Sequence, residues 1–126
     1  MTTADTLAYI SAALVALWGV AHAIATRSVV TAFGSISRDN RLVITQEWLA
    51  EALTMWFIAA VVAVTPAVAG PEQSIVAWLY RVTAVMLAMV AALTAVTGAR
   101  TPVVWFKVCP VLLGSTAVLL LVASRL

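Results

Sequence analysis

Four long apolar runs dominate this sequence, at about residues 7–27, 45–65, 75–97 and 104–123. Each is close to the roughly 20 residues that an α-helix needs to cross the hydrocarbon core of a bilayer. Inside lipid, every backbone N–H and C=O group must find a partner within the protein, so these runs must be helices. Short connections favour antiparallel neighbours. The sequence therefore predicts an all-α, up-down bundle of four transmembrane helices, with residues 1–126 forming a single integral membrane domain.

Composition excludes several other classes of protein. Hydrophobic residues make up 64% of the chain and charged residues only 10%, too few to cover a water-soluble surface. The basic residues stand singly between apolar runs, so they do not predict binding to nucleic acid. A single cysteine excludes an internal disulfide. The start of the chain lacks the basic segment of a signal peptide, so we expect the first apolar run to be a retained helix.

The distribution of basic residues predicts an orientation. Loops rich in Lys and Arg remain on the cytoplasmic side of a membrane. Five of the seven basic residues lie in or beside the first and third loops, and the other two lie toward the opposite side. We therefore expect a multi-pass protein of the cell (inner) membrane, with both termini on the outer side. The five are Arg27, Arg38, Arg41, Arg100 and Lys107; the two are Arg81 and Arg125.

Three ionisable residues stand out against this apolar background. His22, the only histidine, lies near the end of the first run, and Glu47 and Glu51 lie one helical turn apart at the start of the second. Ionisable groups near lipid are costly and often mark function. Histidine also exchanges a proton near neutral pH. We expect His22, Glu47 and Glu51 to be candidate acid/base residues, with a structural bundle histidine and a charged helix start as the alternatives.

Helical spacing predicts which other residues share a pocket with them. Ser11, Val15, Trp18, His22 and Thr26 form one stripe of the first helix. Together with stripes of the second and third helices, it would enclose a cavity that is polar at its cytoplasmic end and suits an amphiphilic ligand. The expected ligand-binding residues are Trp18, Arg27, Met55, Thr94, Thr97 and Arg100.

The start of the second helix decides how deep Glu51 lies. If the membrane span begins at Ala52, both glutamates lie at the solvated interface; if it begins near Leu42, they lie inside the bundle. Asp39 or Asn40 is the expected N-cap. Trp48 and Trp105 are most simply residues of the interfacial aromatic belt.

Three segments carry a resemblance to a known group of proteins: GVAHAIATRSVVTAFG, ITQEWLAEALTMW and FKVCP. With the chain length and the four spans, they resemble segments of small bacterial four-helix membrane proteins, including the DoxX-like group. The resemblance implies a four-helix membrane fold. It implies no activity and no catalytic residue.

Three functions fit these observations. The first is binding or conversion of a lipid-soluble isoprenoid, quinone or sterol-like substrate by acid/base chemistry at Glu51 and His22, of the isomerase, cyclase or epoxide-opening type. The second is an oligomeric proton- or cation-coupled transporter or channel subunit, and the third is an accessory subunit of a membrane complex. The expected partners are membrane lipids, a hydrophobic small molecule, and further copies of the chain or a larger complex. No phosphate, haem, flavin or metal-ligand motif is present, so we expect no cofactor and no metal.

Overall fold

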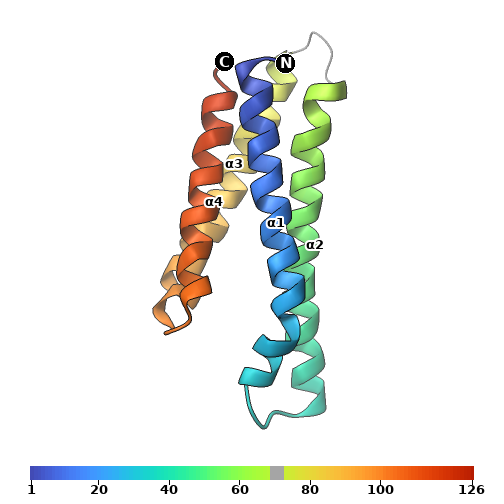
Figure 1. Ribbon diagram of the computed structural model, residues 1–126, viewed down its shortest axis with the longest axis vertical. Helices are drawn as coiled ribbons and strands as arrows, with labels where there is room; N and C mark the ends of the chain where they lie inside the picture. Colours follow the sequence, from blue (N-terminus) through green and yellow to red (C-terminus); the bar gives the residue numbers. More distant parts are fainter. Residues whose placement is uncertain (69–72) are drawn as a thin grey trace.

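The structure is a computed structural model that describes residues 1–68 and 73–126. Its helices are α1 (Thr3–Ala32), α2 (Arg38–Val68), α3 (Gln73–Val96) and α4 (Val104–Ala123), with a short 3₁₀ helix, η1 (Gly98–Arg100), before α4 (Figure 1). Four helices are long and apolar enough to cross a membrane. The predicted all-α four-helix bundle is confirmed, and the chain is a multi-pass membrane protein.

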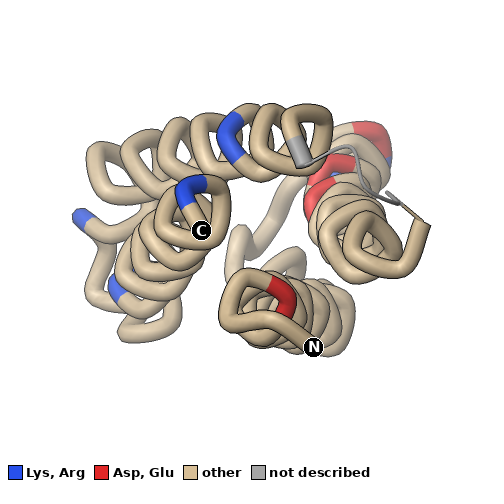
Figure 2. Tube along the Cα trace, turned by 90° about the horizontal axis from the view of Figure 1, so that it is seen from above, with Lys and Arg blue, Asp and Glu red and all other residues tan. Residues whose placement is uncertain are grey.

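The bundle consists of two antiparallel hairpins. α1 packs along α2, and α3 packs along α4. The hairpins meet mainly where α1 contacts α4, whereas α2 and α3 barely touch. Figure 2, seen from above, shows α1 between α2 and α4. Both termini lie at the same end of the bundle, as an even number of antiparallel spans requires (Figure 1).

Helix starts follow local capping chemistry. At α1, the Thr2 side chain accepts a hydrogen bond from the Asp5 N–H, and the Asp5 carboxylate accepts one from the Thr2 N–H, which forms a capping box. At α2, the hydroxyl of Ser37 accepts from the N–H of Asn40 at 3.1 Å. The predicted N-cap at Asp39 or Asn40 is therefore wrong, because α2 already begins at Arg38 and both residues lie in its first turn.

The first hairpin is longer than the predicted spans. α1 has 30 residues and α2 has 31, which at about 1.5 Å per residue gives roughly 45 Å, against a hydrocarbon core of about 30 Å. α3 and α4, with 24 and 20 residues, are shorter. The first hairpin therefore extends past the second at the end opposite the termini (Figure 1).

Pro66, Gly70 and Pro71 are expected to break the chain between the second and third spans. Pro66 lies inside the last turn of α2, which continues to Val68. Gly70 and Pro71 lie outside the described residues. Pro110 lies inside α4, as expected for a proline in the first turns of the fourth helix. Each of these two helical prolines removes one backbone hydrogen bond, a loss that membrane helices tolerate because neighbouring helices and hydroxyl side chains can satisfy the freed carbonyl group.

Close packing of small residues joins the helices of the first hairpin. A Cβ atom added at Gly19 would lie 2.7 Å from Trp56 Nε1 and 3.2 Å from the carbonyl oxygen of Ala52. The Trp56 indole therefore lies directly on α1, where its N–H donates to the carbonyl oxygen of Ala16 at 3.2 Å. This close approach fixes the register of α1 against α2 at Ala16 and Gly19, next to Trp18.

Candidate functional site

His22 is held at the inner face of α1 by its own helix. Its side chain is buried, with 6% of the residue exposed. Nδ1 lies 3.3 Å from the carbonyl oxygen of Trp18, one turn earlier. Because a carbonyl oxygen can only accept, this contact requires the hydrogen on Nδ1. The geometry therefore leaves Nε2 as the ring nitrogen that is available for proton exchange.

Aromatic side chains from three segments surround the imidazole. Trp48 of α2 stacks on His22, with ring centroids 4.8 Å apart and planes inclined by 21°. Trp18 meets the His22 ring edge-on at 5.6 Å. Phe106 of α4 packs edge-on against Trp48 at 5.7 Å. The indole N–H of Trp48 also donates to the carbonyl oxygen of His22 at 2.8 Å, which ties α2 to α1 at this residue.

Glu51 is the acidic partner of this histidine. Its Oε2 lies 3.6 Å from His22 Nε2, within ion-pair range but longer than a hydrogen bond. The glutamate side chain is 37% exposed and the histidine side chain 7%. Within residues 1–68 and 73–126, Glu51 has no ion pair with a lysine or arginine. The carboxylate of Glu51 therefore faces Nε2 and would form an ion pair with a protonated imidazole.

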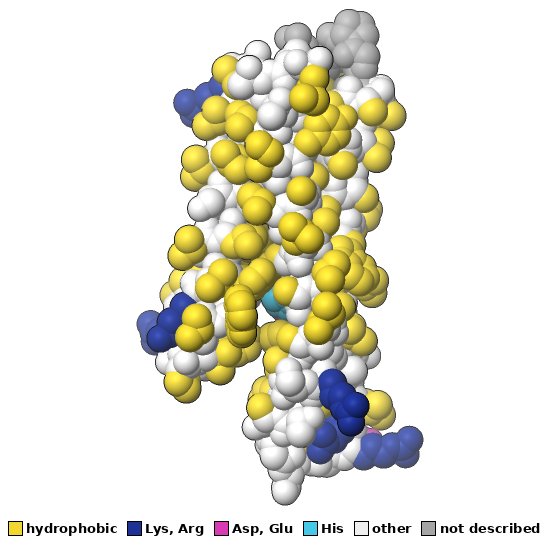
Figure 3. Space-filling model, viewed as in Figure 1, with side chains coloured by type: hydrophobic (Ala, Val, Ile, Leu, Met, Phe, Trp, Pro, Cys, Tyr) yellow, Lys and Arg dark blue, Asp and Glu magenta, His cyan; other side chains and the backbone are white. Residues whose placement is uncertain are grey.

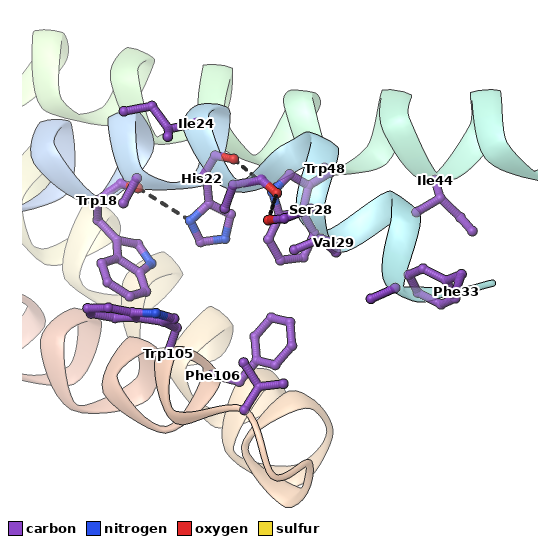
Figure 4. Close-up of a pocket in the computed structure, with 14 residues that line it drawn as sticks. Trp18, His22, Ile24, Ser28, Val29, Phe33, Ile44, Trp48, Trp105 and Phe106 are labelled. Carbon is purple, nitrogen blue, oxygen red and sulfur yellow. Dashed lines mark hydrogen bonds between the residues drawn. The ribbon is translucent and has the colours of Figure 1, made fainter.

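A cavity of about 850 Å³ opens beside the imidazole. It lies between the second half of α1, the start of α2 and residues 103–106, where the second hairpin diverges from the first (Figure 4). In the space-filling view, the single histidine is visible in the notch between the hairpins, with apolar side chains around it (Figure 3). His22 is the only histidine, acid or base among the described residues that line this cavity. They are Trp18, Ala21, His22, Ile24, Ala25, Ser28, Val29, Ala32, Phe33, Ile44, Trp48, Val103, Trp105 and Phe106.

Arg27 lies beside the cavity rather than in it. It is exposed and lines a second, shallower pocket of about 590 Å³ together with Thr31. Ile24, Ser28 and Ala32 line both pockets. Arg27 is thus next to the mouth of the apolar cavity and about one turn of α1 beyond His22.

The structure separates several other predicted site residues from this cavity. Glu47 is exposed and does not line it. Met55 is 3% exposed and belongs to the packed core. Thr94 and Thr97 direct their hydroxyls to the carbonyl oxygens of Val90 and Leu93 of their own helix. Arg100 is exposed in η1.

This separation corrects the predicted pocket of three helical stripes. None of the described α3 residues lines the cavity, because α3 packs against α4 and the hairpins meet mainly through α1 and α4. Residues at the start of α4 take the place expected for α3. Trp48 and Trp105, expected in the interfacial belt, both line the cavity.

The inward face of α2 offered a signal that could have identified Trp48. Ala52, Met55, Ala59 and Val62 are all buried, at a helical spacing of three and four residues. Extending this spacing backward by four residues from Ala52 leads to Trp48, not to Glu47. The spacing of apolar residues along α2 therefore indicates its inner face better than the pair of carboxylates does.

No group of three or more metal-binding side chains occurs in the part of the chain that the structure describes. Comparison of the chain with protein-family models, with curated proteins and with solved structures gave no match. The site must therefore be interpreted from its own geometry.

Proposed function

We propose that this membrane protein binds a lipid-soluble molecule of the isoprenoid, quinone or sterol-like class in the cavity beside His22, and that His22 and Glu51 act on it as an acid/base pair. One observation carries the proposal: among the residues that the structure describes, a paired histidine is the only ionisable one that lines an apolar cavity of about 850 Å³. Ligand pockets of this size are commonly apolar with a few placed polar groups.

The tautomer of His22 gives each atom of the pair a role. Nδ1 keeps its hydrogen through the contact with the Trp18 carbonyl oxygen. Nε2 is then the atom that takes or gives a proton, and the carboxylate of Glu51 stabilises the imidazolium that forms. Glu51, at 37% exposed, can exchange the proton with the surroundings. Proton transfer of this kind serves isomerisation, cyclisation or epoxide opening without a redox cofactor.

The depth of the pair suits a substrate that enters from lipid. Glu51 lies 13 residues after the first residue of α2, or about 20 Å along a helix that rises about 1.5 Å per residue. The cavity opens toward the lipid between the two hairpins, so a hydrophobic molecule reaches His22 without crossing water. The polar partner, Glu51, belongs to the neighbouring helix and does not line the cavity.

Charge supports an orientation in the cell (inner) membrane. Basic residues of the first loop and the third loop lie at the end of the bundle opposite the termini, and Figure 3 shows most of the visible basic side chains toward that end. The excess of Lys and Arg favours the cytoplasm for these loops. Both termini are then on the outer side, and the His22 cavity opens in the cytoplasmic leaflet.

Binding is tested by filling the cavity. Ala21 lines it, whereas Ala13 is also an exposed alanine of α1 but does not. The full chain in nanodiscs is labelled with a diazirine-tagged farnesol, with untagged farnesol as competitor. We expect competable labelling in the wild type and in Ala13→Phe, and its loss in Ala21→Phe. Equal labelling of both variants would contradict the proposed cavity.

The acid/base step is tested with total lipid extracts. Purified wild-type protein is incubated with the extract, and lipids are compared by chromatography and mass spectrometry. We expect a lipid that is converted by the wild type and by Glu47→Gln, but not by His22→Gln or Glu51→Gln. Conversion by all four proteins would show that the pair does no chemistry.

A further inference from the structure

The indole N–H of Trp18, in the wall of the cavity, is a hydrogen-bond donor without an oxygen or nitrogen acceptor. The residue is 8% exposed, and its indole Nε1 is buried without a hydrogen-bond partner among the residues that the structure describes. In Figure 4 the nitrogen edge of Trp18 is turned toward the space between α1 and the start of α4. The thiol of Cys109 on α4 lies near the indole, but sulfur is a weak acceptor.

Three other polar side chains in the wall of the cavity already have partners, and the indole of the remaining one, Trp105, is exposed rather than buried. The indole of Trp48 donates to the carbonyl oxygen of His22, and the hydroxyl of Ser28 donates to that of Ala25. The Nδ1 hydrogen of His22 is directed to the Trp18 carbonyl oxygen. Trp18 Nε1 is therefore the one buried donor among the described lining residues whose only neighbouring acceptor is a sulfur atom.

The chemistry of an indole restricts what that ligand can offer. Indole N–H can only donate, so it requires an acceptor. A buried polar group without a partner is costly, and most such groups in proteins have one. An acceptor oxygen on the bound molecule would satisfy Trp18. Because the Trp18 and His22 rings are 5.6 Å apart, that oxygen would lie beside the imidazole.

We infer that the cavity takes a lipid-soluble molecule with a carbonyl oxygen, of the quinone or keto-lipid type, and that Trp18 Nε1 donates a hydrogen bond to this oxygen. The inference rests on the proposed binding function and narrows its ligand class. A hydrocarbon isoprenoid would fill the same cavity but leave the Trp18 donor without a partner. Trp18 is thus the residue that distinguishes a carbonyl ligand from a purely apolar one.

The test compares two probes that share a tail and differ in their oxygens, decylbenzoquinone and decylbenzene. The five tryptophans give five indole N–H signals in a proton–nitrogen correlation spectrum of the full chain in nanodiscs. The signal that is missing in Trp18→Phe is that of Trp18. We expect decylbenzoquinone to move this signal downfield saturably, and decylbenzene to leave it without a downfield hydrogen-bond shift.

Binding affinities give an independent readout. Loss of one hydrogen bond should weaken decylbenzoquinone binding about fivefold to tenfold in Trp18→Phe, with little change for decylbenzene. Trp56→Phe is the matched control, since the Trp56 indole bonds to Ala16 outside the cavity. It should leave the preference between the two probes unchanged.

The outcomes separate this inference from the proposed function. If both probes bind equally, with no downfield shift of Trp18 and no effect of Trp18→Phe, the cavity binds ligands but the carbonyl contact is wrong. If neither probe binds, the proposed ligand cavity is wrong, and the proposed hydrogen bond from Trp18 to the ligand is wrong as well. If Trp18→Phe does not fold, the variants Trp48→Phe, Trp56→Phe, Trp78→Phe and Trp105→Phe assign the other four indole signals, and the fifth is that of Trp18.

Discussion

His22 Nε2 lies 3.6 Å from Glu51 Oε2, while Nδ1 of the same ring lies 3.3 Å from the carbonyl oxygen of Trp18. The two nitrogens therefore have different partners and different roles. One anchors the ring to α1, and the other faces a carboxylate from α2. The two glutamates of α2 are therefore unequal, because Nε2 faces Glu51 and not Glu47.

Replacing Glu51 by Gln should change the environment of His22, whereas replacing Glu47 should not. The amide removes the negative charge opposite Nε2 but keeps the size of the side chain. Glu47 is exposed and has no described contact with the imidazole. The chain has one histidine, so selective nitrogen labelling of histidine gives the signals of His22 alone. We expect the Nε2 signal to move in Glu51→Gln and to stay in place in Glu47→Gln. Equal shifts in the two variants would argue against the pair.

Trp48→Phe should loosen the first hairpin. The substitution keeps an aromatic ring over His22 but removes the bond from Nε1 to the His22 carbonyl oxygen. Hydrogen bonds between membrane helices contribute about 1 kcal/mol, so the free energy of unfolding should fall by that order. Trp78→Phe serves as the control, because Trp78 is 64% exposed. Titration with a denaturing detergent measures both, and equal stabilities would contradict the role of the bond.

Gly19→Ala should be more destabilising than Gly114→Ala. A Cβ at Gly19 would lie 2.7 Å from Trp56 Nε1 and 3.2 Å from the Ala52 carbonyl oxygen, so the indole must move and α1 and α2 must separate slightly. Overpacking of this kind costs about 1–3 kcal/mol. A Cβ at Gly114 meets nothing within 4 Å, so that change should be neutral or slightly stabilising. Thermal unfolding of the two variants in the same detergent compares their stabilities. A Gly19→Ala protein as stable as the wild type would show that Trp56 can move away from α1 without loss of stability.

The orientation can be checked with single cysteines. Cys109 is buried, so new cysteines at Ser35, in the first loop, and at Leu126 report on the two sides. A thiol reagent that does not cross membranes should label Leu126→Cys in intact cells and Ser35→Cys only after permeabilisation. The opposite pattern would invert the topology.

The fold was predictable because it depends on features that one sequence displays. The length of an apolar run determines whether a helix can cross a bilayer, and α1 also shows its inner face by spacing: Ser11, Val15, Trp18, His22 and Thr26 are all buried. The helix itself is longer than the predicted span, because α1 continues to Ala32 beyond the apolar run. Run length and residue spacing are local properties, so both can be determined from the sequence alone.

The site was only partly predictable because it depends on which helices meet. The approach of Glu51 to His22 follows from packing of α1 on α2. From their positions in the sequence, Thr97 and Arg100 are expected at the same depth in the membrane as His22. They lie outside the cavity because α3 contacts α4 rather than α1. The cavity itself forms where two hairpins diverge, a relation between elements distant in the chain. No spacing within one helix encodes that divergence.

The most direct test of the ligand cavity uses the signals of the single histidine. The full chain, labelled at histidine and held in nanodiscs, is titrated in turn with decylbenzoquinone, farnesol and a sterol. We predict that at least one of them shifts the His22 ring signals saturably, and that Ala21→Phe abolishes the shift while Ala13→Phe retains it. Unchanged His22 signals with all three molecules would contradict a ligand site beside this histidine.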